Sequence, residues 1–305
     1  MDLYIDGTGK INQAGVDHYN KLVNALLAQG IEPYVTLYHW DLPQALHDRY
    51  NGWLSPQIIK DFAAFAETCF ENYGDRVKHW ITFNEPHTVA IQGYDVGKKQ
   101  QGSMGISLDV IWFEPATNTT VDTEATQRAQ DFQLGWFIEP LILGNYPISM
   151  RNRVGDRLPN FTKNDVALVK GSLDFVGINH YTTFYAQSND FLLGDLIGKL
   201  LHDSLADSGT LTLPFGENLK PIGDRANSIW LYIVPRGLRS LMNYIREKYG
   251  NPPVIITENG MDDPNNALTP IKDALKDAKR IKYHEAYLES LLASIKYGSL
   301  VAFML

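Results

Sequence analysis

The chain has 305 residues, of which 44% are hydrophobic and 20% charged, and its formal net charge is −8. This composition is ordinary for a globular protein with a large core, and the acidic balance argues against nucleic acid or an anionic membrane as a partner. No apolar run is long enough to predict a transmembrane helix. The single cysteine, Cys69, cannot form an intrachain disulfide, and we expect a buried, unreactive thiol.

Apolar spacing predicts that helices and strands alternate along the chain. Val16 and Val23 lie on one face of a first helix that ends near Gly30, and Ser55 and Pro56 supply the cap and first-turn proline of a second. The expected strands are residues 31–40, 77–83, 106–113, 173–181 and 254–257, with 299–305 as the start of a sixth. The other expected helices are 124–143, 228–249 and 272–296, the second broken or kinked at Pro235, whereas residues 183–226 are expected to be irregular.

This alternation, with nearly continuous apolar strands, predicts an α/β fold of parallel strands covered by helices. No glycine-rich phosphate loop follows any strand, which argues against a nucleotide-binding open sheet. Polar residues cluster after strand ends, where a (β/α)8 TIM barrel places its active site. We therefore expect residues 1–305 to form a single, partial barrel domain. It is incomplete because five to six of eight strands are present and residues 86–106 lack the stripe of a covering helix.

Two glutamates are placed alike, Glu85 in TFNEP and Glu258 in ITENG, each at the end of an apolar strand. A buried, unpaired carboxylate costs several kcal/mol, so each needs either a basic partner or a chemical role. Glycoside hydrolysis uses two carboxyl groups, which are about 5–5.5 Å apart in retaining enzymes. The pair therefore favours this chemistry. Glu258 needs hydrogen-bond donors to stay ionised, and the Tyr181 hydroxyl is a candidate.

Aromatic and polar residues near the strand ends fit a sugar-binding site. Trp40 and Trp230 could stack on a sugar or its leaving group, although core packing is nearly as good an interpretation. His39 and Asn84 could hydrogen-bond sugar hydroxyls, although a structural role for the histidine is equally open. A metal site is the competing hypothesis, but its residues match no compact ligand motif. Those residues are His39, Asp41, His87 and His180.

Read together, YHWDLPQAL, TFNEP, DFVGINHYT and VIITENG resemble the plant β-glucosidases of glycoside hydrolase family 1 over roughly residues 7–297. The resemblance implies a (β/α)8 barrel and a retaining double displacement on β-D-glucosides of plant metabolites, without cofactor or metal. It also implies Glu85 as the acid/base and Glu258 as the nucleophile. The residues that it assigns to substrate binding are His39, Asn84, Tyr181 and Trp230, Tyr181 as the donor to the nucleophile.

The chain departs from this family in three places. It lacks the first two barrel strands, a long segment after Gly97, and the last strand with its sugar-binding region. We therefore expect a chain that is truncated at both ends and has an internal deletion. The expected activity is that of a β-glucosidase. The alternatives are a transglucosidase, or a non-catalytic relic that binds sugar or a paralogue. The aglycone, the glycone preference and the oligomeric state stay open. The compartment also stays open. The first residues show no secretion signal, so we expect either a cytoplasmic chain or, if the true N-terminus is missing, a secretory or vacuolar one.

Overall fold

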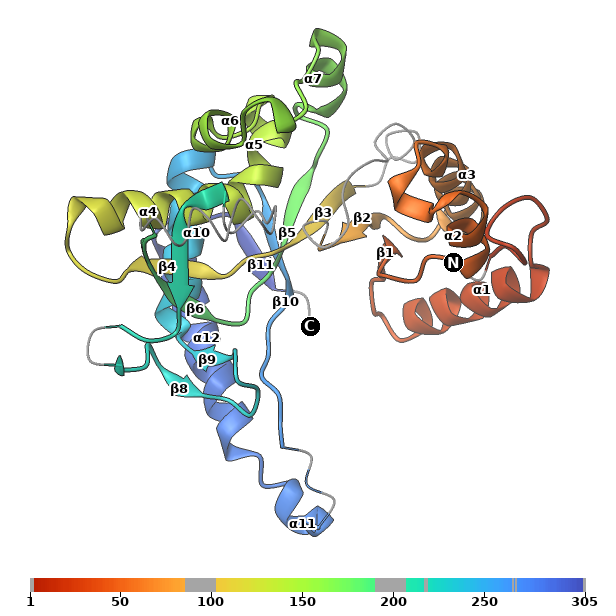
Figure 1. The fold of residues 1–305 in the computed structure, drawn as a ribbon. Coiled ribbons are helices and arrows are strands. Elements are labelled where there is room, and N and C mark those ends of the chain that lie inside the picture. Colours follow the sequence, from red (N-terminus) through yellow and green to blue (C-terminus); the bar gives the residue numbers. More distant parts are fainter. Residues whose placement is uncertain are drawn as a thin grey trace. The chain divides into compact units, whose positions relative to one another are not determined.

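The computed structural model describes residues 3–85, 103–189, 207–216, 219–264, 266 and 268–303 (Figure 1). No helix in these ranges is both long and apolar enough to span a bilayer. The helices are α1 (Gln13–Ala28), α2 (Gln44–Tyr50), α3 (Gln57–Tyr73), α4 (Thr120–Gln130), α5 (Trp136–Leu143), α6 (Ile148–Val154), α7 (Lys163–Val169), α10 (Pro235–Tyr249), α11 (Ile271–Ala274) and α12 (Ala278–Lys296).

The strands form one large parallel sheet and two small sheets. They are β1 (Tyr34–Tyr38), β2 (His79–Asn84), β3 (Ser103–Asp109), β4 (Trp112–Pro115), β5 (Phe175–Asn179), β6 (Thr183–Ser188), β7 (Thr210–Leu213), β8 (Asp224–Arg225), β9 (Tyr232–Ile233), β10 (Val254–Glu258) and β11 (Val301–Phe303). The large sheet has the order β1-β2-β3-β5-β10-β11, the second β4-β6-β7, and the third is the hairpin β8-β9. The six strands expected of the parallel sheet are thereby confirmed.

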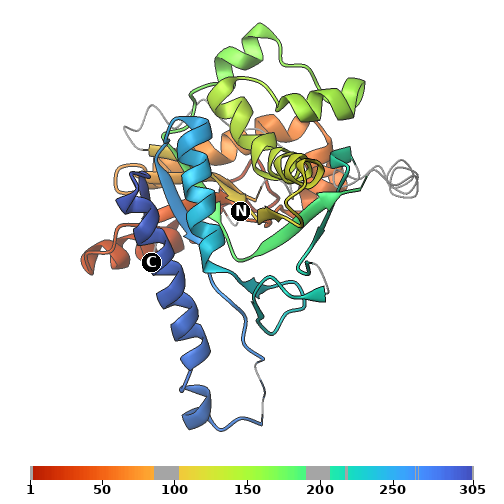
Figure 2. The same cartoon turned by 90° about the vertical axis from the view of Figure 1, so that its left-hand side faces the viewer.

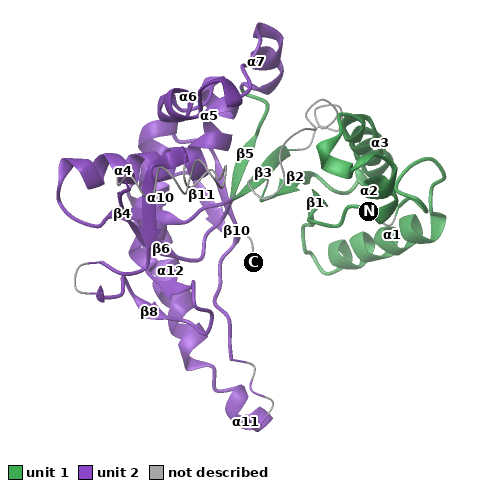
Figure 3. Cartoon of the chain, viewed as in Figure 1, with its two compact units in different colours: residues 1–108, 171–177 green, residues 109–170, 178–305 purple. Residues whose placement is uncertain are grey.

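One compact unit comprises residues 1–108 and 171–177 (Figure 3). In it β1 pairs in parallel with β2, and Tyr38 lies opposite Phe83 near the carboxyl ends of the two strands. The rings of Tyr38 and Phe83 pack edge to face on Trp53. Helix α3 covers this core, and its Cys69 is buried as expected, which raises the pKa of the thiol to about 12. The aromatic packing therefore holds the strand ends from which His39 and Asn84 are presented.

The other unit comprises residues 109–170 and 178–305. Helix α12 runs along α10, as Figure 2 shows from the side. A π-helical turn, Asp131–Gly135, joins α4 to α5 and contributes to a buried ion cluster with α10. In this cluster Lys248 Nζ lies 2.8 Å from Asp131 Oδ1 and 2.8 Å from Glu139 Oε1. Both carboxylates are nearly inaccessible, so the lysine is what neutralises them.

Five expected segments were wrong in part. Residues 106–113 divide into β3 and β4 because the Val110 N–H donates to Asn179 O, after which Trp112 pairs with β6 in a different sheet. Residues 183–226 are not wholly irregular, since β6, β7 and β8 lie within them. These short strands are half-exposed, so they lack the continuous apolar run that marked the others.

The expected helix 228–249 starts only at Pro235, which occupies the first turn of α10 and does not kink it. Proline is favoured there because the first-turn N–H has no intrahelical partner. The helix expected at 124–143 is divided by the π-helical turn, and that at 272–296 is divided into α11 and α12. The crossover expected to lack a covering helix, residues 86–106, falls mostly outside the described residues.

Candidate active site

One group of candidate site residues lies at the carboxyl ends of β1 and β2, in the unit of residues 1–108 and 171–177. Because these strands are parallel neighbours, the residues that follow them lie side by side. Asn84, the last residue of β2, is buried, and its Nδ2 lies 3.2 Å from Nε2 of the exposed His39. If the amide donates, His39 carries its proton on Nδ1. This arrangement leaves one polar edge of the imidazole for a ligand hydroxyl.

Glu85 directly follows β2 and adopts a left-handed backbone conformation, with φ of 53°. Its N–H donates to Ser107 O on β3 at 2.8 Å, which anchors the turn. Non-glycine residues in this conformation are uncommon and are typical of functional sites, where surrounding structure holds the strain. Trp40, after β1, shares this conformation and is 53% exposed, with φ of 67°. The left-handed turn is therefore compatible with a functional role for Glu85, but Asn51 and Asn251 share the conformation and it does not by itself assign one.

A second group of candidate site residues, in the unit of residues 109–170 and 178–305, surrounds Glu258, the last residue of β10. The Tyr181 hydroxyl donates a short hydrogen bond to Glu258 Oε2, as expected from the sequence. The backbones are also joined, since the His180 N–H donates to Glu258 O at 3.0 Å. The hydroxyl therefore fixes the orientation of the Glu258 carboxyl group. The arrangement suits a nucleophile.

Side chains that the sequence reasoning missed hold Tyr181 in place. Its carbonyl accepts hydrogen bonds from the Tyr283 and Tyr287 hydroxyls of α12, at 3.3 and 3.1 Å. Asn259 Nδ2 donates to His180 O at 2.7 Å and lies 2.9 Å from the Tyr283 hydroxyl. The two tyrosines are four positions apart on a predicted helix, a spacing that could have indicated a shared inward face.

His180 is a core residue. It is fully buried, its Nδ1–H donates to Val110 O at 2.7 Å, and burial lowers its pKa to about 4. The imidazole is therefore neutral and is not presented to solvent. Across the described part of the chain, no group of three or more His, Cys, Asp or Glu side chains is arranged to hold a metal ion. His87, another residue of the metal hypothesis, lies outside the described residues.

Trp230 lies in the loop between β8 and β9 and is 47% exposed. Its ring stands edge to face with that of Tyr181, with centroids 6.1 Å apart and planes at 86°. The exposed indole therefore lies beside the tyrosine whose hydroxyl contacts Glu258. Trp230 thus joins Tyr181 and Glu258 in one unit, and His39, Asn84 and Glu85 belong to the other.

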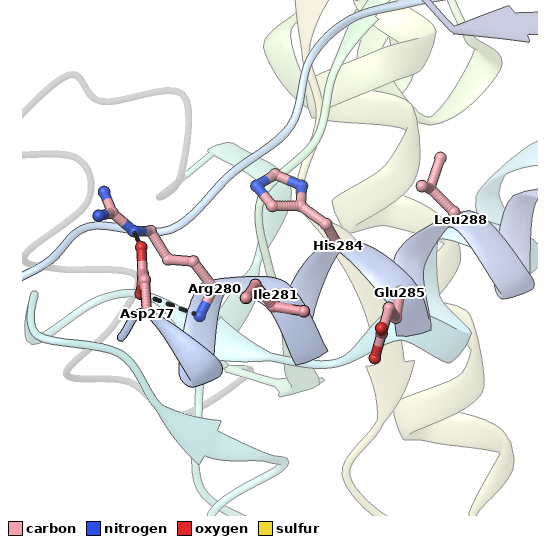
Figure 4. A pocket seen from close by; sticks show the side chains of 6 residues that line it. All are labelled: Asp277, Arg280, Ile281, His284, Glu285 and Leu288. Atoms are coloured by element: carbon pink, nitrogen blue, oxygen red, sulfur yellow. Dashed lines mark hydrogen bonds and ion pairs between the residues drawn. The ribbon is translucent and has the colours of Figure 1, made fainter. Parts of the chain in front are cut away.

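A separate hollow of about 500 Å³ lies along the exposed face of α12 (Figure 4). Its lining comes from Asp277, Arg280, Ile281, His284, Glu285 and Leu288. All six belong to α12 or its N-cap, and none is a predicted site residue. This open hollow on one helix does not have the convergent polar groups of a ligand site.

The profile of glycosyl hydrolase family 1 matches residues 3–100 and 95–303. The chain belongs to glycosyl hydrolase family 1. It is 63% identical to β-glucosidase 40 of Arabidopsis thaliana, over 96% of this chain and 66% of the relative, and 58% identical to β-glucosidase 6 of Oryza sativa subsp. japonica, over 96% and 65%. The chain thus spans about two thirds of the length of these curated relatives.

Among solved structures, the chain is similar to a rice β-glucosidase mutant in a covalent complex with glucose. The TM-score is 0.93 at 56% identity, covering 99% of this chain and 72% of that one. Family 1 enzymes of this kind are (β/α)8 barrels, and the six-stranded parallel sheet is an incomplete one. The family 1 profile matches in two pieces that overlap at residues 95–100. The alignments with the two curated relatives extend over 341 positions, which is longer than the 305 residues of this chain. The expected internal deletion in this glycosyl hydrolase family 1 chain is consistent with both observations.

Proposed function

We propose that this chain is a retaining β-glucosidase that hydrolyses small-molecule β-D-glucosides, with Glu258 as nucleophile and Glu85 as acid/base. The observation that carries the proposal is the hydrogen bond from the Tyr181 hydroxyl to Glu258 Oε2. It supplies what a nucleophilic carboxylate needs to attack one carbon atom, a donor that fixes the orientation of the carboxyl group. The family membership and the β-glucosidase relatives support the choice of substrate class.

In the first step a Glu258 carboxylate oxygen attacks the anomeric carbon, and the bond from that carbon to the leaving oxygen breaks. Glu85 gives its proton to the leaving oxygen. In the second step Glu85, now ionised, takes a proton from water, whose oxygen attacks the anomeric carbon and releases Glu258. Two carboxyl groups about 5–5.5 Å apart perform this sequence in retaining enzymes. The rice relative, described in a covalent complex with glucose, supports the glucosyl–enzyme intermediate.

The remaining site residues would bind the substrate around these two carboxyl groups. We assign His39 and Asn84 to the glucose hydroxyls, because their side chains are already hydrogen-bonded at the edge of β1 and β2. We assign Trp230 to the leaving group, because its exposed ring stands beside Tyr181. No cofactor or metal is part of this mechanism. We also propose that the two compact units belong to one partial barrel domain, residues 1–305.

A mechanism-based inhibitor tests the assignment directly. A 2-deoxy-2-fluoro-β-glucoside with a good leaving group should add one fluoroglucosyl group, and peptide mapping should place it on Glu258. The Glu258→Gln variant should take no label, whereas Glu85→Gln should still react with the activated inhibitor but lose turnover of substrates with poor leaving groups. Labelling of another residue, or no label on a sample that unfolds cooperatively, would contradict the proposal. Product analysis with an added alcohol separates hydrolysis from transglucosylation.

A further inference from the structure

The loop that carries Trp230 has buried ends, at Ala226 and Leu231, and an exposed tip. Residues 226–231 connect β8 to β9, and the Ala226 N–H donates to Leu231 O across the loop base. At the tip Ile229 is 79% exposed and Trp230 47% exposed. Exposed segments open easily, so polar anchors near the tip are needed to set the position of the indole.

Asp262 supplies the anchor nearest the loop tip. Its Oδ2 accepts hydrogen bonds from both the Ser228 N–H, at 2.7 Å, and the Ser228 hydroxyl, at 2.9 Å. Hydrogen bonds to a charged acceptor are about twice as strong as neutral ones. Burial would raise the pKa of Asp262, but the hydrogen bonds from Ser228 and Asn227 lower it below the ordinary value, so the carboxylate stays charged.

The base of the same loop is hydrogen-bonded to Thr182, the residue that follows Tyr181. The Tyr232 N–H donates to Thr182 Oγ1 at 3.0 Å, and the Thr182 hydroxyl donates to Tyr232 O at 2.9 Å. Thr182 follows Tyr181 in the chain, and Asp262 lies shortly after Glu258. The two anchors therefore attach the Trp230 loop to both segments that make the Tyr181–Glu258 hydrogen bond.

We propose that Asp262 is a positioning residue that holds Trp230 at the leaving-group side of the nucleophile and thereby contributes to aglycone preference. This inference rests on the proposed function. Asp262 acts through Ser228 and does not itself contact the substrate. Without it the loop base remains attached through Thr182, so the indole loses its orientation while the surrounding unit stays folded.

Two substrates distinguish positioning from a general structural role. A nitrophenyl β-glucoside has an aromatic leaving group that Trp230 can contact, whereas β-glucosyl fluoride has none. Loss of a hydrogen bond to a charged acceptor should lower kcat/KM for the nitrophenyl substrate about tenfold in Asp262→Ala. The fluoride should change by no more than about twofold. Trp230→Ala should show the same pattern, and adding Asp262→Ala to it should bring no further loss.

Conservative variants and controls complete the kinetic test. Asp262→Asn should retain most of the selectivity, because an amide oxygen still accepts from Ser228, and Ser228→Ala should give an intermediate loss. Asp273→Asn removes an exposed charge on α11 and should leave both substrates unchanged. Equal losses on the two substrates, or full additivity with Trp230→Ala, would overturn the proposal.

Amide hydrogen exchange gives a readout that does not depend on activity. In Asp262→Ala, peptides covering residues 226–231 should exchange about tenfold faster, while those covering β10 keep their protection. Unchanged exchange in the loop would overturn the positioning role even if activity falls. If the wild-type chain turns over neither substrate, the proposed function fails, and the exchange data alone decide whether Asp262 holds the loop.

Discussion

Asp109 ends β3 and is half-buried, with one of its two carboxyl oxygens inaccessible to solvent. Its Oδ1 is buried without a hydrogen-bond partner among the described residues, and burial raises its pKa from 3.8 to about 6. The charged form is therefore disfavoured in the folded chain. Replacing Asp109 with asparagine keeps the shape of the side chain and removes the ionisation.

The sign and size of the effect follow from linkage. A carboxyl with a raised pKa binds more protons in the folded than in the unfolded state, so stability is lost as pH rises from 3.8 to about 6. At 1.36 kcal/mol per pKa unit, this amounts to about 3 kcal/mol. His180 has the opposite sign, because burial lowers its pKa from 6.5 to about 4, and stability is lost as pH falls through that range. The two contributions largely offset each other between pH 4 and 6.

The Asp109→Asn variant should therefore be more stable than the wild-type chain by about 3 kcal/mol at pH 7 and nearly equal to it at pH 4. Urea unfolding at several pH values measures the difference, in which contributions common to both proteins cancel. The exposed Asp156→Asn is the matched control and should give a small difference that does not depend on pH. A pH-independent difference for Asp109→Asn, or destabilisation at pH 7, would refute the reasoning.

Three further predictions concern the unit of residues 109–170 and 178–305 and the buried thiol of Cys69. Tyr181→Phe keeps the ring but removes the donor to Glu258, so kcat/KM should fall about 10–100-fold with little change in melting temperature, and undiminished turnover would argue against the assigned contact. Lys248→Met leaves the two carboxylates of the buried ion cluster unpaired and should cost about 3–5 kcal/mol in urea unfolding, whereas a loss below about 1 kcal/mol would show that solvent reaches them. Cys69 should resist iodoacetamide at pH 8 in the folded chain and react once unfolded; rapid alkylation of the native state would contradict its burial.

Much of the fold was predictable because its signals are local. The strands β2 and β5 are buried along nearly their whole length, as their apolar runs predict, and the apolar runs of β1 and β10 are buried in part. The start of α3 after Pro56 likewise depends only on neighbouring residues. By contrast, β6 and β7 are half-exposed, and their pairing is made with partners far along the chain. No local pattern distinguishes such strands from irregular segments.

The candidate site shows the same division. Glu85 and Glu258 could be chosen from the sequence because a carboxylate at the end of an apolar strand is costly to bury without a partner or a role. Whether His180 is a ligand or a core residue was open until the structure placed it fully inside, with Nδ1 on Val110 O.

The sequence by itself determined the family, the order of the parallel strands along the chain and the residue types at their carboxyl ends. Only the tertiary structure decided which partners those residues meet: Tyr181 on Glu258, the α12 tyrosines on the Tyr181 carbonyl, and Asp262 on Ser228. The reason is physical. Strand and helix formation depends on neighbours along the chain, whereas a hydrogen bond between distant segments depends on how the packed elements bring two side chains within about 3 Å.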